Sequence, residues 1–216
     1  MTKTAIIIGA TGFIGKILLN KLLMDNTFDR IKLFSRSSVH IDSPKIDEYL
    51  VDMLALEKHS EGFKGDVVFC CVGTTASKTP DKNKYARVDY GIPVTAAKLS
   101  KANRIPRFIV MSSMGADPSS SVFYNRIKGE MERDVLLCEI ENTYILRPSL
   151  IGGRRAEVRK GERFAQFMMG SFDLIVPNKY KMIHPERIAT TMLWLSKNTF
   201  SKRILPSELI LKIGLR

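Results

Sequence analysis

The chain has 216 residues, about the size of one domain, which leaves no room for a large separate substrate domain. Hydrophobic residues make up 44% and charged residues 26%, as in ordinary globular chains, so wholesale disorder is excluded. Charge is the unusual property, because 34 Lys and Arg against 22 Asp and Glu give a formal net charge of +12. Such an excess indicates an anionic partner, which would be nucleic acid, an acidic membrane surface or a phosphorylated small molecule.

The N-terminal segment and the cysteines indicate in which cellular compartment the protein is expected. The apolar run from Ala5 to Ile8 is too short for a signal-peptide core or a membrane span. Cys70, Cys71 and Cys138 match neither a disulfide framework nor a zinc spacing, and the three histidines form no paired ligand pattern. We therefore expect a cytoplasmic protein with no metal site and no membrane partner.

Short apolar strands alternate with amphipathic helices along the chain. The expected strands cover residues 5–8, 31–34, 49–51, 66–72, 108–111 and 143–146. The expected helices cover residues 13–24, about 85–99 and about 124–139, and Pro93 either kinks the second or stands in its first turn. This alternation predicts a doubly wound, mostly parallel α/β sheet, the Rossmann fold, with helices on both faces. We expect one domain over residues 1–216, in which residues 148–216 form a small C-terminal part on the substrate side.

A glycine-rich turn, GATGFIG, follows the first expected strand and opens the first expected helix. Small residues there let the backbone turn tightly and approach a pyrophosphate, which then meets free amide groups and the positive end of the helix dipole. Glycines in such a turn can also serve geometry alone, but their place inside a strand–helix–strand unit favours dinucleotide binding. The expected cofactor contacts are Gly9, Thr11, Gly12, Phe13, Ile14 and Gly15.

The end of the second expected strand bears on the choice of cofactor. NAD enzymes place an acidic residue about 20 positions past the glycines, where it binds the ribose hydroxyls. This chain has Ser35 there, followed by Arg36, whose guanidinium can bind a 2′-phosphate through two hydrogen bonds. The pattern predicts NADP rather than NAD, and the alternative is that Arg36 is an ordinary solvated cation.

Tyr124 and Lys128 are candidate catalytic residues. Side chains at i and i+4 share one face of a helix, so the ammonium can lie beside the phenol and stabilise its phenolate form. The preceding strand ends in Ser112 and Ser113, 12 and 11 residues before the tyrosine. A hydroxyl at either position could hydrogen-bond a substrate oxygen in the same cleft.

With these motifs in place, the chain resembles the short-chain dehydrogenase/reductase superfamily, and within it the Tat-interacting-protein-like and epimerase/dehydratase-like members. The resemblance rests on GATGFIG at residues 9–15, VMSSMGAD at 110–117, YNRIK at 124–128 and LRPSLIGG at 146–153. IHPERIA at residues 183–189 adds a weaker similarity.

The resemblance implies an NADP enzyme in which Tyr124 transfers the proton and Lys128 holds the nicotinamide ribose. A strand-end serine would polarise the reacting oxygen, and the choice between Ser112 and Ser113 stays open. Further cofactor contacts are implied at Val72 and Gly73 beside the ribose, Pro148 beside the nicotinamide and Asp52 near the adenine.

We therefore expect an NADP-dependent oxidoreductase that moves hydride between the nicotinamide and a small carbonyl, alcohol or quinone. The alternatives are a non-catalytic NADP sensor that regulates a protein partner, and a sugar-nucleotide epimerase or dehydratase. The basic loop from Arg154 to Arg163 is either a solvated turn or a lid that attracts phosphates. No nucleic-acid-binding motif accompanies the positive charge, and no pattern indicates an oligomeric state.

Overall fold

The computed structural model describes residues 2–152 and 182–215, so the basic loop from Arg154 to Arg163 lies outside the described residues. The strands are β1 (Lys3–Ile8), β2 (Phe28–Ser35), β3 (Ile46–Leu50), β4 (Val67–Cys70), β5 (Arg107–Met111), β6 (Asn142–Arg147) and β7 (Ile204–Pro206). The helices are α1 (Phe13–Met24), η1 (Met53–His59), α2 (Lys82–Ala86), η2 (Arg87–Gly91), α3 (Ile92–Ala102), α4 (Phe123–Leu136), α6 (Pro185–Lys197) and α7 (Ser207–Ile213).

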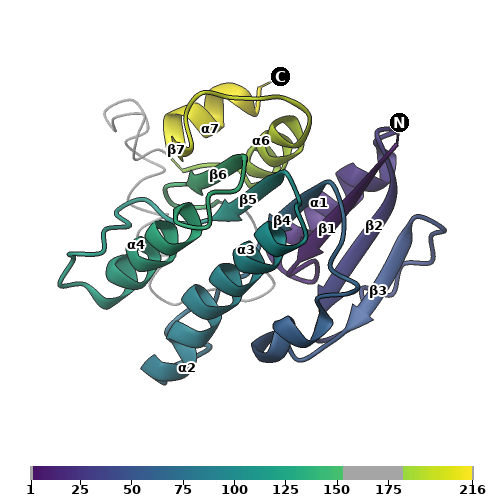
Figure 1. Cartoon of the computed structure of the whole chain (residues 1–216). Coiled ribbons are helices and arrows are strands. Elements are labelled where there is room, and N and C mark those ends of the chain that lie inside the picture. Colours follow the sequence, from purple (N-terminus) through teal and green to yellow (C-terminus); the bar gives the residue numbers. More distant parts are fainter. Residues whose placement is uncertain (1, 153–181, 216) are drawn as a thin grey trace.

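The seven strands form one sheet in the order β3-β2-β1-β4-β5-β6-β7, and every pair is parallel. Helices α1, α6 and α7 pack on one face, and α3 and α4 cover the other (Figure 1). The predicted doubly wound Rossmann fold is thus confirmed. The strand order reverses between β1 and β4, and in sheets of this kind ligands bind beyond the carboxyl ends of the strands at this reversal.

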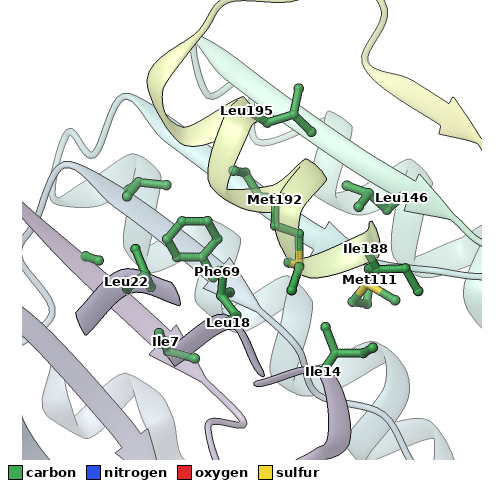
Figure 2. Packing of buried hydrophobic residues seen from close by; sticks show 14 of the residues in the cluster. Ile7, Ile14, Leu18, Leu22, Phe69, Met111, Leu146, Ile188, Met192 and Leu195 are labelled. Carbon is green, nitrogen blue, oxygen red and sulfur yellow. The ribbon is translucent and has the colours of Figure 1, made fainter. Parts of the chain in front are cut away.

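Strand β1 shows why a continuous apolar run predicts a central strand. Ala5 and Ile7 belong to the hydrophobic cluster under α1 and α6, and Ile6 and Ile8 belong to the cluster under α3 and α4. Successive side chains of a strand point to opposite faces, so both faces of β1 are buried. Figure 2 shows the first of these clusters, which includes Leu18 of α1, Phe69 of β4 and Met192 of α6.

The predicted helix around Pro93 is divided in the structure. Helix α2 runs into the π-helical turn η2, and α3 begins at Ile92 with Pro93 in its first turn. A proline has no N–H to donate to the carbonyl four residues earlier, which here is that of Asp89. The α-helical ladder is therefore interrupted at Asp89, and the wider π-turn occupies this position.

The C-terminal part of the chain completes the sheet, which the sequence analysis did not predict. Strand β7 pairs with β6 as the last strand, and α6 packs against α1. A strand of three residues is too short to show a hydrophobic period, so no pattern identified it. The substrate-side role of residues 148–216 stays a prediction, since residues 153–181 are outside the described part.

Candidate cofactor and active site

The glycine turn lies against the loop after β4, at the switch in strand order. Gly9 has a φ of +87°, which favours glycine, and a Cβ atom there would lie 3.2 Å from the backbone of Cys71 and Val72. A Cβ atom on Gly15 would lie 2.1 Å from the carbonyl oxygen of Gly9. The turn closes with a hydrogen bond from the Gly12 N–H to the Gly9 oxygen, 3.0 Å. Two backbone segments therefore approach each other at a distance that only glycine permits.

The beginning of α1 suits an anionic group. The helix starts at Phe13 after Gly12, and its first turn contains no acidic side chain that would repel a pyrophosphate. Ile14 is buried in the core, whereas Thr11 and Phe13 are half-buried at the turn. A ligand at this turn would therefore meet the backbone of Ile14 rather than its side chain.

At the end of β2, the structure places Arg36 on the surface and Ser35 inside. Arg36 is exposed and forms no salt bridge with a described residue, and the hydroxyl of Ser35 is hydrogen-bonded to its own loop. The sequence analysis missed Glu48, which β3 brings to this loop, where its carboxylate accepts from Ser38 Oγ at 2.6 Å. Asp52 is exposed and caps η1 by accepting a backbone N–H at 2.9 Å.

Tyr124 and Lys128 lie one helical turn apart on α4 but differ in exposure. Tyr124 is 40% exposed, whereas Lys128 is only 3% exposed. The Tyr124 side chain is therefore partly exposed, whereas the Lys128 ammonium is enclosed. A buried ammonium requires a partner, because desolvation of an unpaired charge is costly.

That partner is Asp89, which the sequence analysis did not identify. The Nζ atom of Lys128 lies 2.8 Å from Asp89 Oδ1, and Asp89 Oδ2 accepts the backbone N–H of Thr74 at 2.7 Å. Gly73 borders the same carboxylate, since a Cβ atom there would lie 3.6 Å from Oδ1. Burial disfavours the charged ammonium, but the negative charge of Asp89, with a smaller effect of Tyr124, holds the pKa of Lys128 above its ordinary value.

The two strand-end serines have different environments. Ser112 Oγ donates a hydrogen bond to the carboxylate of Glu132, which Arg147 also binds through its Nε and Nη2 groups. Ser113 Oγ is buried and has no hydrogen-bond partner in residues 2–152 and 182–215. Pro148 is buried, and its carbonyl accepts a hydrogen bond from the backbone N–H of Met114, which links the end of β6 to the end of β5. Of the two hydroxyls, that of Ser113 is the one left for a ligand.

A cavity of about 380 Å³ opens beside Tyr124. Its lining comes from the loop after β4, from α2 and from the first turn of α4: Thr74, Thr75, Ala76, Thr79, Pro80, Lys82, Tyr85, Phe123 and Tyr124. The Tyr85 ring meets the Tyr124 ring edge-on, with 6.4 Å between the ring centroids. Since Asp89 binds the backbone of Thr74, the carboxylate that holds Lys128 also fixes one wall of this cavity.

A family model described as NAD(P)H-binding matches residues 9–149. The chain belongs to this NAD(P)H-binding family. The matched region contains the glycine turn, Arg36, Asp89, both serines and the tyrosine–lysine pair, so the family assignment covers almost the whole candidate site.

Curated relatives of this NAD(P)H-binding chain are identical to it at about a third of the aligned residues. Protein HTATIP2 of Rattus norvegicus is 35% identical over 173 residues, which are 78% of this chain and 71% of that protein. Protein FMP52-1, mitochondrial, of Scheffersomyces stipitis is 31% identical over 163 residues, which are 73% and 71% of the two chains. These relatives confirm the resemblance to the Tat-interacting-protein-like branch of the short-chain dehydrogenase/reductase superfamily.

Solved structures share the fold at much lower identity. ElxO with NADP bound has a TM-score of 0.72 at 17% identity and covers 97% of this chain and 99% of that one. The Bordetella bronchiseptica enzyme WbmH in complex with NAD+ has a TM-score of 0.71 at 13% identity, with 95% and 75% covered. These structures thus include one with NAD+ and one with NADP. At such low identity they show that the fold is shared and nothing further.

Two further properties concern the described ranges 2–152 and 182–215. No helix within them is long and apolar enough to cross a membrane, and no three His, Cys, Asp or Glu residues within them are grouped to hold a metal ion. The FMP52 relatives are named as mitochondrial proteins, so the cytoplasmic location of this chain stays a prediction.

Proposed function

We propose that this NAD(P)H-binding protein is an NADP-dependent oxidoreductase that interconverts a small carbonyl compound and its alcohol. The observation that carries the proposal is the pair of residues on α4. Tyr124 lines a cavity, and Lys128, one helical turn further, is a buried positive charge that interacts electrostatically with Tyr124. A protein that only bound the cofactor would have no need of a phenol beside an enclosed ammonium.

Tyr124, Lys128 and Ser113 have distinct roles in the proposed reaction. When bound, the nicotinamide supplies a hydride for the carbonyl carbon or takes one from the alcohol. Tyr124 donates its phenolic proton to the carbonyl oxygen as the C–O double bond becomes single, and takes a proton back from the alcohol in the reverse direction. Lys128 stabilises the resulting phenolate through its positive charge. Ser113 donates a hydrogen bond to the same substrate oxygen.

The glycine turn and Arg36 support NADP as the cofactor. The turn offers a close backbone approach and a helix start free of acidic side chains, which suits the pyrophosphate. Arg36 is exposed at the end of β2, where a 2′-phosphate would lie, and it has no salt bridge in the described part of the chain. Glu48, the carboxylate near this loop, already accepts two hydrogen bonds from it.

A screen of NADPH oxidation with aldehydes, ketones and quinones tests the proposal. We expect turnover with at least one small carbonyl compound, and we expect Tyr124→Phe to lower kcat by about 10²-fold or more while NADPH still binds. Tight NADPH binding without turnover on any acceptor, and without an effect of Tyr124→Phe, would instead support the sensor.

A further inference from the structure

The described lining of the cavity beside Tyr124 includes a positively charged residue, Lys82. Lys82 is the one charged residue among its described lining residues, and it forms no salt bridge with a described residue. The ammonium lies over the ring of Phe123, 5.6 Å from the ring centroid, so the side chain is directed along the cavity wall.

The acidic residue beside Lys82 in the sequence does not neutralise it. The carboxylate of Asp81 accepts the backbone N–H of Lys84 at 2.6 Å and so caps the start of α2. Asp81 is not part of the cavity lining. An anion that enters the cavity would therefore meet an ammonium with no competing carboxylate on the described lining.

The rest of the lining is suited to a flat, partly apolar molecule. Tyr85 lies edge-on to Phe123, with 5.6 Å between the centroids, and also edge-on to Tyr124. Three aromatic residues thus line the cavity, and aromatic rings favour stacked or edge-to-face contact with another ring. The hydroxyls of Thr74 and Thr79 pair with each other at 2.8 Å, which reduces the polarity of the wall that they share.

The volume of the cavity beside Tyr124 suits a small ligand. Its volume of about 380 Å³ lies near the lower end of the range of roughly 300–1,000 Å³ found for small-molecule sites. One substituted ring fits this space. A single ammonium balances a single negative charge, which favours a carboxylate over a phosphate dianion.

We propose that the substrate is a small aromatic carbonyl compound that carries one carboxylate. Its ring lies among Tyr85, Phe123 and Tyr124, its carboxylate binds Lys82, and its carbonyl oxygen points to Tyr124. This inference rests on the proposed reaction, and it adds the substrate class and a residue that selects it.

The test compares 4-formylbenzoate with its uncharged methyl ester as NADPH-dependent substrates. The wild-type protein prefers the carboxylate in kcat/KM, and Lys82→Met lowers the ratio of the two values by about fivefold, as expected for a partly exposed ion pair. Lys84→Met is the matched control, because it removes one cation from the same helix without touching the lining, and it leaves the ratio unchanged.

A binding measurement separates this inference from the proposed reaction. Calorimetry with benzoate and benzamide, in the presence of NADP, requires no turnover. A preference for benzoate that Lys82→Met abolishes supports the anion site, even where neither aldehyde is reduced and the proposed reaction fails. Equal binding of benzoate and benzamide, or the same preference in Lys82→Met as in the wild type, overturns the inference, even where the aldehydes are reduced.

Discussion

Asp89 holds the ammonium of Lys128 at 2.8 Å, and the two residues are only 1% and 3% exposed. The second carboxylate oxygen binds the backbone of Thr74, so one side chain joins the π-turn η2, the loop after β4 and helix α4. An ammonium has three N–H donors. Asp89 takes one of them, which leaves donors on Lys128 for the ribose in the proposed complex.

Asp89→Asn removes the counter-charge of a buried ammonium. We expect the free energy of unfolding to fall by about 3 kcal/mol, because an uncompensated charge then remains in the interior. Urea denaturation at neutral pH measures the change. Asp47→Asn is the control. The salt bridge between Asp47 and Arg30, 3.5 Å long, is exposed to solvent, so its loss lowers the free energy of unfolding by less than ~1 kcal/mol. Equal effects of the two substitutions would contradict the structural role of Asp89.

The same pair predicts a dependence of stability on alkaline pH. The pKa of Lys128 is raised in the folded protein above its ordinary value of 10.5, so the folded state holds this proton more tightly than the unfolded state. The stabilisation is complete below pH 10.5 and is lost as pH rises through the folded-state pKa. We expect the stability difference between wild type and Asp89→Asn to shrink above pH 10.5. A difference that stays constant there would refute the linkage.

We expect Ser112→Ala to lower stability and Ser113→Ala to lower kcat. Ser112→Ala removes a hydrogen bond to Glu132, so we expect a loss of about 1–2 kcal/mol of stability with little change in kcat. Ser113→Ala removes a hydroxyl that has no described partner, so we expect unchanged stability and a kcat lower by about 10²-fold. Thermal unfolding and steady-state kinetics of both variants decide the roles, and the reverse pattern would assign the substrate oxygen to Ser112.

The Rossmann fold and the glycine turn were predictable because both depend on local sequence. A strand buried on both faces must be apolar throughout, and a turn with no room for a Cβ atom must contain glycine, as at Gly9 and Gly15. Tyr124 and Lys128 were found for the same reason, since a spacing of four residues is visible on one helix.

The partners of these residues were not predictable, because they come from distant parts of the chain. Asp89 is 39 positions before Lys128 in the sequence and lies in the π-turn beside Pro93. Glu132, which accepts the hydrogen bond of Ser112, is 20 positions after that serine. The cavity wall around Lys82 likewise depends on how the loop after β4 meets α4. Spacing alone contains no signal for such contacts.

Arg36→Ala tests the choice of cofactor. We expect the Kd for NADPH to rise by roughly tenfold and that for NADH to stay the same, because only NADPH carries the 2′-phosphate. Fluorescence titration with each cofactor measures both constants. Arg203→Ala is the control, since this exposed cation precedes β7 at the opposite edge of the parallel sheet. Equal weakening of both cofactors would show that Arg36 does not discriminate.

Gly15→Ala tests the close approach in the glycine turn. The added Cβ atom would meet the backbone oxygen of Gly9 at 2.1 Å, so the turn must move. We expect the Kd for NADPH to rise by about tenfold or more, ~1.4 kcal/mol of binding free energy. Gly91→Ala provides the comparison, because the nearest atom to its Cβ would be 4.0 Å away. Unchanged NADPH binding in Gly15→Ala would place the cofactor elsewhere.

Transfer of deuterium from NADPH labelled at C4 of the nicotinamide tests the proposed reaction most directly. Wild-type protein, 4-formylbenzoate and each of the two stereospecifically labelled cofactors are incubated, and the product alcohol is analysed by mass spectrometry. Hydride transfer predicts one deuterium on the carbinol carbon from one labelled cofactor and none from the other, with product formation reduced by about 10²-fold in Tyr124→Phe. An unlabelled product from both cofactors, or equal product formation by Tyr124→Phe and wild type, would contradict hydride transfer assisted by Tyr124.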